Sequence, residues 1–178
     1  MSRNRGKGSA YLVALVGVLT ALSVVTLYFS AVSPTARLGL TAVAGLFPAG
    51  AVVSSGLGAG FFCYGATGLL GLLLVPDKGN VVLYLLFLGL WPMLKSLFER
   101  LSSRILEWVC KLAAFNIILA IFWFGLRELL LPFLPPILDQ GWMIFAGGSI
   151  AFVIYDVGFS KLIAFYEARV DRVLRKGA

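Results

Sequence analysis

Asp156 is the residue of this chain whose type and position could do the most chemistry. It lies within the apolar run 150–159, and a charged carboxylate at the centre of a bilayer costs about 2.5–3.5 kcal/mol on insertion scales. Some partner must therefore compensate it. Three interpretations are open: a proton or ion relay, the floor of a solute cavity, or a structural ion pair that joins the last helix to the fourth or fifth helix.

Counting inward from the helix ends predicts a buried polar layer at the depth of Asp156. Asn116 and Tyr64 fall at a similar depth on the fifth and third apolar runs, and the layer has four members: Tyr64, Asn116, Tyr155 and Asp156. Lysine stems are long enough to span about one helical turn toward the carboxylate. The lysines placed to do so are Lys95, Lys111 and Lys161.

A second polar set is predicted on the outer side of the membrane, where a solute would enter. Asp77 and Lys78 could bind a zwitterionic or anionic solute together with an arginine. The candidate solute-binding residues are Arg37, Asp77, Lys78, Asn80, Trp123 and Arg127. The alternative is that the charged members are solvated loop residues, and that Trp123, like Tyr155, is a packing or interface aromatic.

The central stretch 95–111 combines recurring charge with apolar residues three to four positions apart. Its apolar members are Leu97, Leu101, Ile105 and Trp108, a spacing that is typical of an amphipathic helix. We interpret residues 95–107 as a cytoplasmic amphipathic hinge between two membrane-spanning halves. The pairs Lys95–Glu99 and Glu107–Lys111 stand four residues apart, which predicts weak ion pairs on a solvated helix face; a docking surface for a cytoplasmic partner is the alternative.

The elements that must position these residues are membrane helices. Of the 178 residues, 60% are hydrophobic and 13% are charged, about half the charged share of a soluble domain. Lipid must therefore solvate most of the chain. The net charge of +7 gathers at the two termini and the hinge, which fits anionic lipid headgroups and excludes nucleic acid as the expected partner.

We interpret six apolar runs as membrane helices, each near the length of about 20 residues that a bilayer requires. They cover residues 10–32, 38–53, 57–75, 81–94, 108–126 and 142–166, with expected kinks at Pro48 and Pro92. The positive-inside rule places the hinge and both basic tails, 1–9 and 167–178, in the cytoplasm. The sequence predicts a single all-α transmembrane domain, residues 1–178, in a cell membrane; a re-entrant segment at 54–56 is the competing topology.

Enzyme and metal signatures are absent from the sequence. It contains no histidine and two cysteines, Cys63 and Cys110, which lie within or beside apolar runs. Neither a zinc site nor a disulfide framework is supported, and no phosphate-binding loop or nucleophile elbow is present. We therefore expect a protein that is not an enzyme and needs no cofactor or metal.

Small residues on the first helix point to a family. Ala14-x-x-Gly17-x-x-x-Ala21-Leu22-Ser23, residues 37–40 and 46–49, and the glycine-rich third helix resemble the S components of bacterial energy-coupling factor (ECF) transporters. The resemblance implies a subunit in the bacterial plasma membrane that captures a vitamin-like or other small solute near the outer face. It also implies a coupling subunit, driven by two ATPases, that docks on small residues of the first helix: Ala10, Ala14, Gly17 and Ala21.

Two functions follow as expectations. The first is a solute-capturing subunit of an ECF-type uptake transporter, whose solute is unidentified because no histidine supports nickel or cobalt. The second is a non-transporting scaffold of the same fold that binds a protein partner through its basic hinge and tail.

Overall fold

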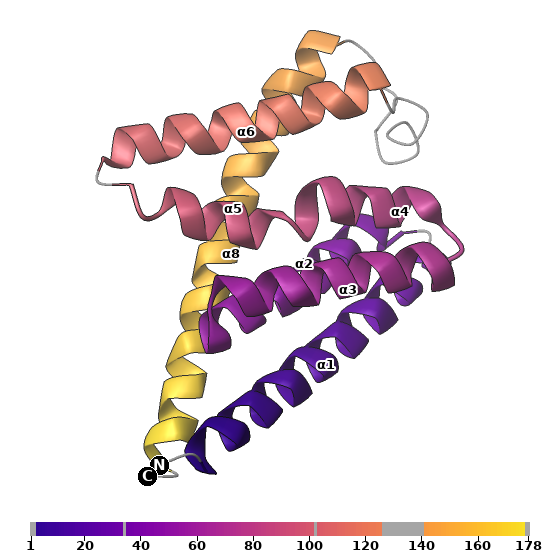
Figure 1. The fold of residues 1–178 in the computed structure, drawn as a ribbon. Coiled ribbons are helices and arrows are strands. Elements are labelled where there is room, and N and C mark those ends of the chain that lie inside the picture. The colour runs from indigo at the N-terminus through magenta and orange to yellow at the C-terminus, as the bar shows by residue number, and fades with distance from the viewer. Residues whose placement is uncertain (1–2, 34, 102, 126–140, 177–178) are drawn as a thin grey trace. The chain divides into compact units, whose positions relative to one another are not determined.

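The computed structural model describes residues 3–33, 35–101, 103–125 and 141–176, and every regular element among them is a helix (Figure 1). Within these residues, six helical spans are long and apolar enough to cross a membrane: Ala10–Val32, Arg37–Ser55, Leu57–Leu74, Lys78–Phe98, Arg104–Gly125 and Trp142–Phe165. The prediction of an all-helical fold with about six helices long and apolar enough to cross a membrane is confirmed for the described residues.

The chain divides into two compact units, Met1–Arg100 and Leu101–Ala178. The first unit contains six helical segments: α1 (Arg3–Val32), α2 (Arg37–Ser55), α3 (Leu57–Leu74), α4 (Lys78–Leu83), η1 (Tyr84–Leu88) and α5 (Trp91–Phe98). Helices α1, α2 and α3 each pack against the other two. Their apolar core is a buried cluster of five residues, Leu27, Ala44, Val75, Val81 and Tyr84.

The glycines of α3 differ in whether a neighbouring helix lies close to them. A Cβ added to Gly60 would overlap a side chain of α2, and one added to Gly68 would overlap a side chain of η1. These two glycines permit the close helix contact that small residues give in membranes. Gly58 and Gly65 differ, because a Cβ added to either would meet nothing within 4 Å.

The fourth span is irregular where a kink near Pro92 was expected. It consists of α4, the π-helical segment η1 and α5, and the Gly89 N–H donates to the Tyr84 carbonyl at 2.7 Å. Pro92 has no N–H to donate to the Leu88 carbonyl. That carbonyl oxygen lies against α2, where a Cβ added to Gly45 would overlap it. The position of the Leu88 carbonyl therefore requires a residue without a Cβ at position 45 of α2.

The central stretch differs from the single amphipathic helix that its periodicity indicates. Helix α5 ends at Phe98, turn residues follow, and α6 (Arg104–Gly125) begins after Ser103. The Ser103 carbonyl accepts the Glu107 N–H at 2.9 Å, which starts the new helix. Serine is favoured immediately before a helix, so Ser103 was a start signal within an otherwise periodic pattern.

The second unit contains α6 and α8 (Gly141–Lys176). Their packing includes stacked rings of Phe115 and Phe152, whose centroids are 4.5 Å apart. A Cβ added to Gly148 would lie 3.2 Å from a methyl carbon of Leu119, so Gly148 gives α6 room.

The segments expected as basic tails are largely helical, since α1 begins at Arg3 and α8 extends to Lys176.

Candidate functional site

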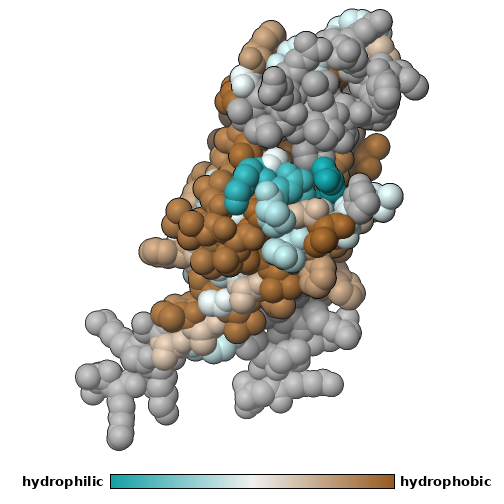
Figure 2. Space-filling model, turned by 90° about the vertical axis from the view of Figure 1, so that its right-hand side faces the viewer, coloured by the Kyte–Doolittle hydropathy of each residue, from teal (hydrophilic) through white to brown (hydrophobic). Residues whose placement is uncertain are grey.

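A polar cluster in the first unit is built from the start of α2 and the turn between α3 and α4. Asp77 caps α4 by accepting the Gly79 N–H at 3.0 Å. Its other carboxylate oxygen lies 3.4 Å from Nη1 of Arg37. Figure 2 shows hydrophilic side chains gathered on the face that includes this turn, with hydrophobic ones beside and below them. The structure therefore brings four of the predicted solute-binding residues, Arg37, Asp77, Lys78 and Asn80, to one place.

Two members of this cluster hold helix ends together. The Lys78 ammonium donates to the carbonyls of Leu72 and Val75 at 2.6 and 2.7 Å, which neutralises acceptors that the end of α3 leaves open. The Asn80 amide donates to the Ser30 hydroxyl of α1 at 3.2 Å. Lys78 and Asn80 therefore already make hydrogen bonds that hold helices of the first unit together.

Unused hydrogen-bonding capacity remains in the cluster. Arg37 Nε and Asn80 Oδ1 are buried and have no hydrogen-bond partner among the described residues. The Arg37 and Asp77 side chains stay 34% and 26% exposed. One donor and one acceptor of the cluster thus lack a partner among the described residues. Of the other two candidates, Trp123 lies half-buried on α6 in the second unit, and Arg127 lies outside the described residues.

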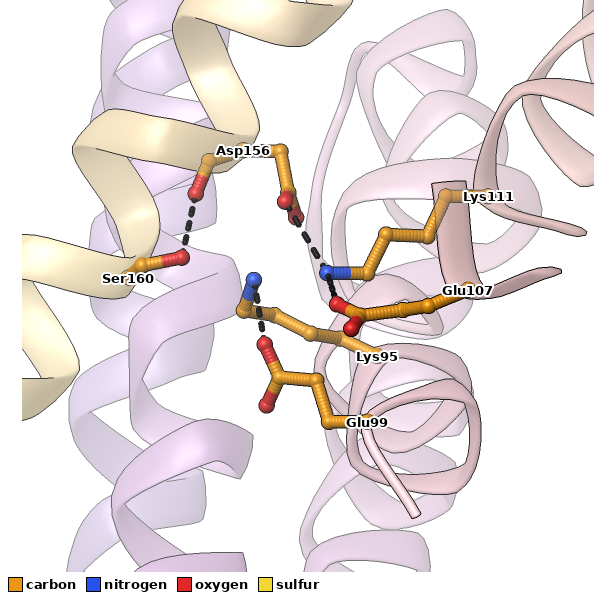
Figure 3. Close-up of polar contacts among 6 residues, drawn as sticks. All are labelled: Lys95, Glu99, Glu107, Lys111, Asp156 and Ser160. Carbon is orange, nitrogen blue, oxygen red and sulfur yellow. Dashed lines mark hydrogen bonds and ion pairs between the residues drawn. The ribbon is translucent and has the colours of Figure 1, made fainter. Parts of the chain in front are cut away.

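Asp156 belongs to a buried ionic cluster of the second unit, with Glu107 and Lys111. The Lys111 ammonium on α6 lies 2.6 Å from Glu107 Oε1 and 3.2 Å from Asp156 Oδ2 on α8 (Figure 3). Lys111 and Asp156 are each 2% exposed and Glu107 is 19% exposed. The Lys111 ammonium also lies 5.5 Å from the ring centroid of Trp108, at cation–π distance.

These contacts give the second unit an ion pair between its two helices. Glu107 and Lys111 are one turn apart on α6, so helical spacing alone aligns them. Asp156 comes from the other helix, 45 residues later, and its backbone carbonyl accepts the Ser160 hydroxyl at 2.8 Å. An ammonium at this distance offsets the unfavourable burial of the Asp156 carboxylate.

Other members of the predicted polar layer make separate contacts. The Tyr64 hydroxyl donates to the Leu85 carbonyl at 2.7 Å. The Asn116 amide donates to the Leu112 carbonyl at 2.9 Å and to the Ser149 hydroxyl at 3.3 Å. The remaining two members are Tyr155, whose ring packs on Phe159 at 5.5 Å, and Lys161, which is exposed.

The prediction that the charged residues of the central stretch lie on a solvated helix face is wrong for Lys95 and Lys111. Lys95 pairs with Glu99 at 2.8 Å and Lys111 pairs with Glu107, but both lysines are only 2% exposed. Spacing predicted these ion pairs, whereas their burial depends on packing. Glu107, which shares Lys111 with Asp156, was not predicted as a member of the buried cluster for the same reason. Ser149, which accepts from Asn116, was also missed, because no sequence signal singles it out.

Helix α1 displays its small residues outward within the first unit. Ala10, Ala14, Gly17 and Ala21 are all exposed. Gly17 and Ala21 also line a groove of about 780 Å³ between α1 and α3.

Comparisons of the chain with protein-family models, curated proteins and solved structures found no match. The functional proposals therefore rest on the residue pattern and on these contacts.

Proposed function

We propose that this chain is a membrane subunit that captures a small solute and docks on a coupling subunit, as an S component of an ECF-type uptake transporter does. The observation behind this proposal is the outward display of Ala10, Ala14, Gly17 and Ala21 on α1. Small side chains let two helix backbones approach closely in a bilayer. A helix that shows four of them outward is suited to receive a partner helix.

The proposed setting is the bacterial plasma membrane, with both termini in the cytoplasm. Six candidate spans among the described residues, an even number, would return the chain to the side on which it started. Basic residues at both termini and in the central connection support this orientation, because lysine and arginine are enriched in cytoplasmic segments. The cluster of Arg37 and Asp77 then lies at the outer end of the first unit.

Solute capture is proposed at that outer cluster. The open groups are the Arg37 Nε donor and the Asn80 Oδ1 acceptor. A small solute with both an acceptor and a donor would satisfy the two atoms, whose burial without partners is unfavourable. Lys78 has a supporting role here, since its ammonium is bound to the end of α3.

A scaffold that transports nothing is the second candidate. One observation favours it: Asp77, Lys78 and Asn80 already make contacts that hold helix ends together, which explains their presence without a solute. In this function, the basic central connection and C-terminal segment bind a protein partner.

The docking proposal is tested by native mass spectrometry of the protein purified from its own host in mild detergent. We expect a complex with a second membrane subunit and two ATPases. Ala14→Leu should remove these subunits because it fills the small-residue face. Val18→Leu, at a position of α1 that is already large and 59% exposed, should leave them bound. Equal recovery of the ATPases with both variants would remove the docking face from the proposal.

The same measurement separates the two candidate functions. A capture subunit should co-purify with a small-molecule mass that disappears in Arg37→Gln. A chain that retains only lipid, or a partner without ATPase subunits, would favour the scaffold.

A further inference from the structure

Helix α8 continues beyond the part of it that is apolar enough to cross a membrane. Its candidate span ends at Phe165, whereas the helix extends to Lys176 (Figure 1). At a rise of about 1.5 Å per residue, residues 166–176 add roughly 16 Å to the length of the span. One face of this helix can therefore run from the hydrocarbon of a bilayer through its headgroup layer.

Within the span, α8 has a packed face and an exposed apolar face. On the packed face, the Phe152 ring stacks on a phenylalanine of α6 and the Asp156 carboxylate pairs with Lys111. Ile154 and Phe165 lie about half a turn away around the helix, at 100° per residue. These two side chains are 69% and 67% exposed, so this face is open to the acyl chains of lipid.

The exposed face continues into a stripe of basic residues. At 100° per residue, four of them fall within about 80° of one another, on the same side of α8 as Ile154 and Phe165. We call them the basic stripe: Lys161, Arg169, Arg172 and Lys176. The acidic residues beyond the span, Glu167 and Asp171, fall on other sides of the helix. Positive charge is therefore concentrated on the face that is apolar within the span.

Two residues of the basic stripe lie on either side of the end of the span. Lys161 is four residues before Phe165 and Arg169 is four residues after it, each about 6 Å from that end along the axis. A lysine near the end of a membrane helix extends its ammonium toward the interface, and an arginine outside it can form paired hydrogen bonds with phosphate oxygens. The spacing thus fits one phosphate group at the boundary of the hydrocarbon.

We propose that this face of α8 binds an anionic phospholipid, with its phosphate between Lys161 and Arg169 and its acyl chains along Ile154 and Phe165. A zwitterionic lipid fits less well, because its own ammonium would lie beside like charges. An acidic soluble protein would leave the apolar half of the face uncovered. The site is separate from the docking face of α1 and from the cluster at Arg37, and it does not depend on solute capture.

Native mass spectrometry of the full-length protein in detergent tests the proposal, with phosphatidylglycerol or phosphatidylcholine of identical acyl chains as the probe. We expect phosphatidylglycerol to bind about tenfold or more tightly than phosphatidylcholine. Arg169→Gln/Arg172→Gln should weaken phosphatidylglycerol binding about tenfold or more, since each basic residue near an anionic lipid surface contributes about fivefold. Arg3→Gln/Arg5→Gln removes the same charge from α1 and should leave the affinity unchanged.

A single variant within the span separates lipid binding from folding. Lys161→Met should weaken phosphatidylglycerol binding about fivefold while leaving the stability of the lipid-free protein unchanged, because Lys161 is exposed. The proposal is overturned by equal affinity for the two lipids, by unchanged binding in Lys161→Met, or by equal weakening in the two arginine double variants, which would show a response to net charge alone. It is also overturned by a protein partner that requires Arg169 and Arg172 when phosphatidylglycerol binding does not.

Discussion

Lys111 shows how one side chain can make a carboxylate tolerable in a membrane helix. Its ammonium lies 3.2 Å from Asp156 and 2.6 Å from Glu107, and Lys111 and Asp156 are nearly fully buried. Removing one member of such a pair strands the other charge, whereas replacing both by apolar residues is often neutral. A variant that removes one charge and a variant that removes every charge of the cluster should therefore differ in stability.

Lys111→Met should destabilise the protein by about 3–5 kcal/mol, because Asp156 then loses its buried counter-ion. The triple variant Glu107→Gln/Lys111→Met/Asp156→Leu, which leaves no unpaired charge in the cluster, should recover most of this loss. Unfolding in mixed micelles measures both free energies. Lys161→Met is the matched control, since Lys161 is exposed on α8, and it should change stability by less than about 0.5 kcal/mol.

A triple variant as unstable as Lys111→Met would contradict this explanation, because the variant contains no unpaired charge at the cluster.

At the scale of elements, the fourth span shows how an irregular helix is accommodated. Segment η1 widens the backbone before Pro92, and the Leu88 carbonyl lies against α2 at Gly45. Backbone cannot move aside as the end of a side chain can. The contact between α2 and η1 therefore depends on the absence of a Cβ at Gly45.

Gly45→Ala should lower stability by about 1–3 kcal/mol, because the added methyl overlaps the Leu88 carbonyl oxygen. Gly39→Ala, on the same helix, should be neutral or stabilising by up to about 1 kcal/mol, since its Cβ meets nothing within 4 Å. Thermal unfolding in detergent compares the two variants. Equal loss of stability in both would show that α2 and η1 are not in close contact.

At the scale of the whole molecule, the proposed topology follows from the number of crossings. The described residues contain six candidate spans, and an even number of crossings would return the C-terminus to the side of the N-terminus. Basic residues at both ends support the proposal that this side is the cytoplasm.

Cysteine labelling in right-side-out vesicles checks this topology. In a Cys63→Ala/Cys110→Ala background, Ser2→Cys and Ala178→Cys should both resist a membrane-impermeant maleimide until the membrane is opened. Protection of only one position would mean an odd number of crossings, and labelling of both in intact vesicles would invert the orientation.

The sequence by itself determined that the described elements are helical and approximately where the six apolar spans lie, although the ends of several helices differ from the prediction. The run 10–32 coincides with the span Ala10–Val32, and 142–166 differs from Trp142–Phe165 by one residue. Hydropathy and turn residues are local properties, so a single stretch contains the information that decides its own state. The Lys95–Glu99 and Glu107–Lys111 pairs follow equally from spacing along one helix.

Only the tertiary structure decided which of these residues are buried and with what partners. Lys111 rather than the exposed Lys161 lies beside Asp156, and Lys78 binds the end of α3. Gly60 allows close packing while Gly58 leaves a groove, although only one residue separates the two on α3. These outcomes depend on side chains brought together from distant parts of the chain, and no local pattern specifies which helix face meets which.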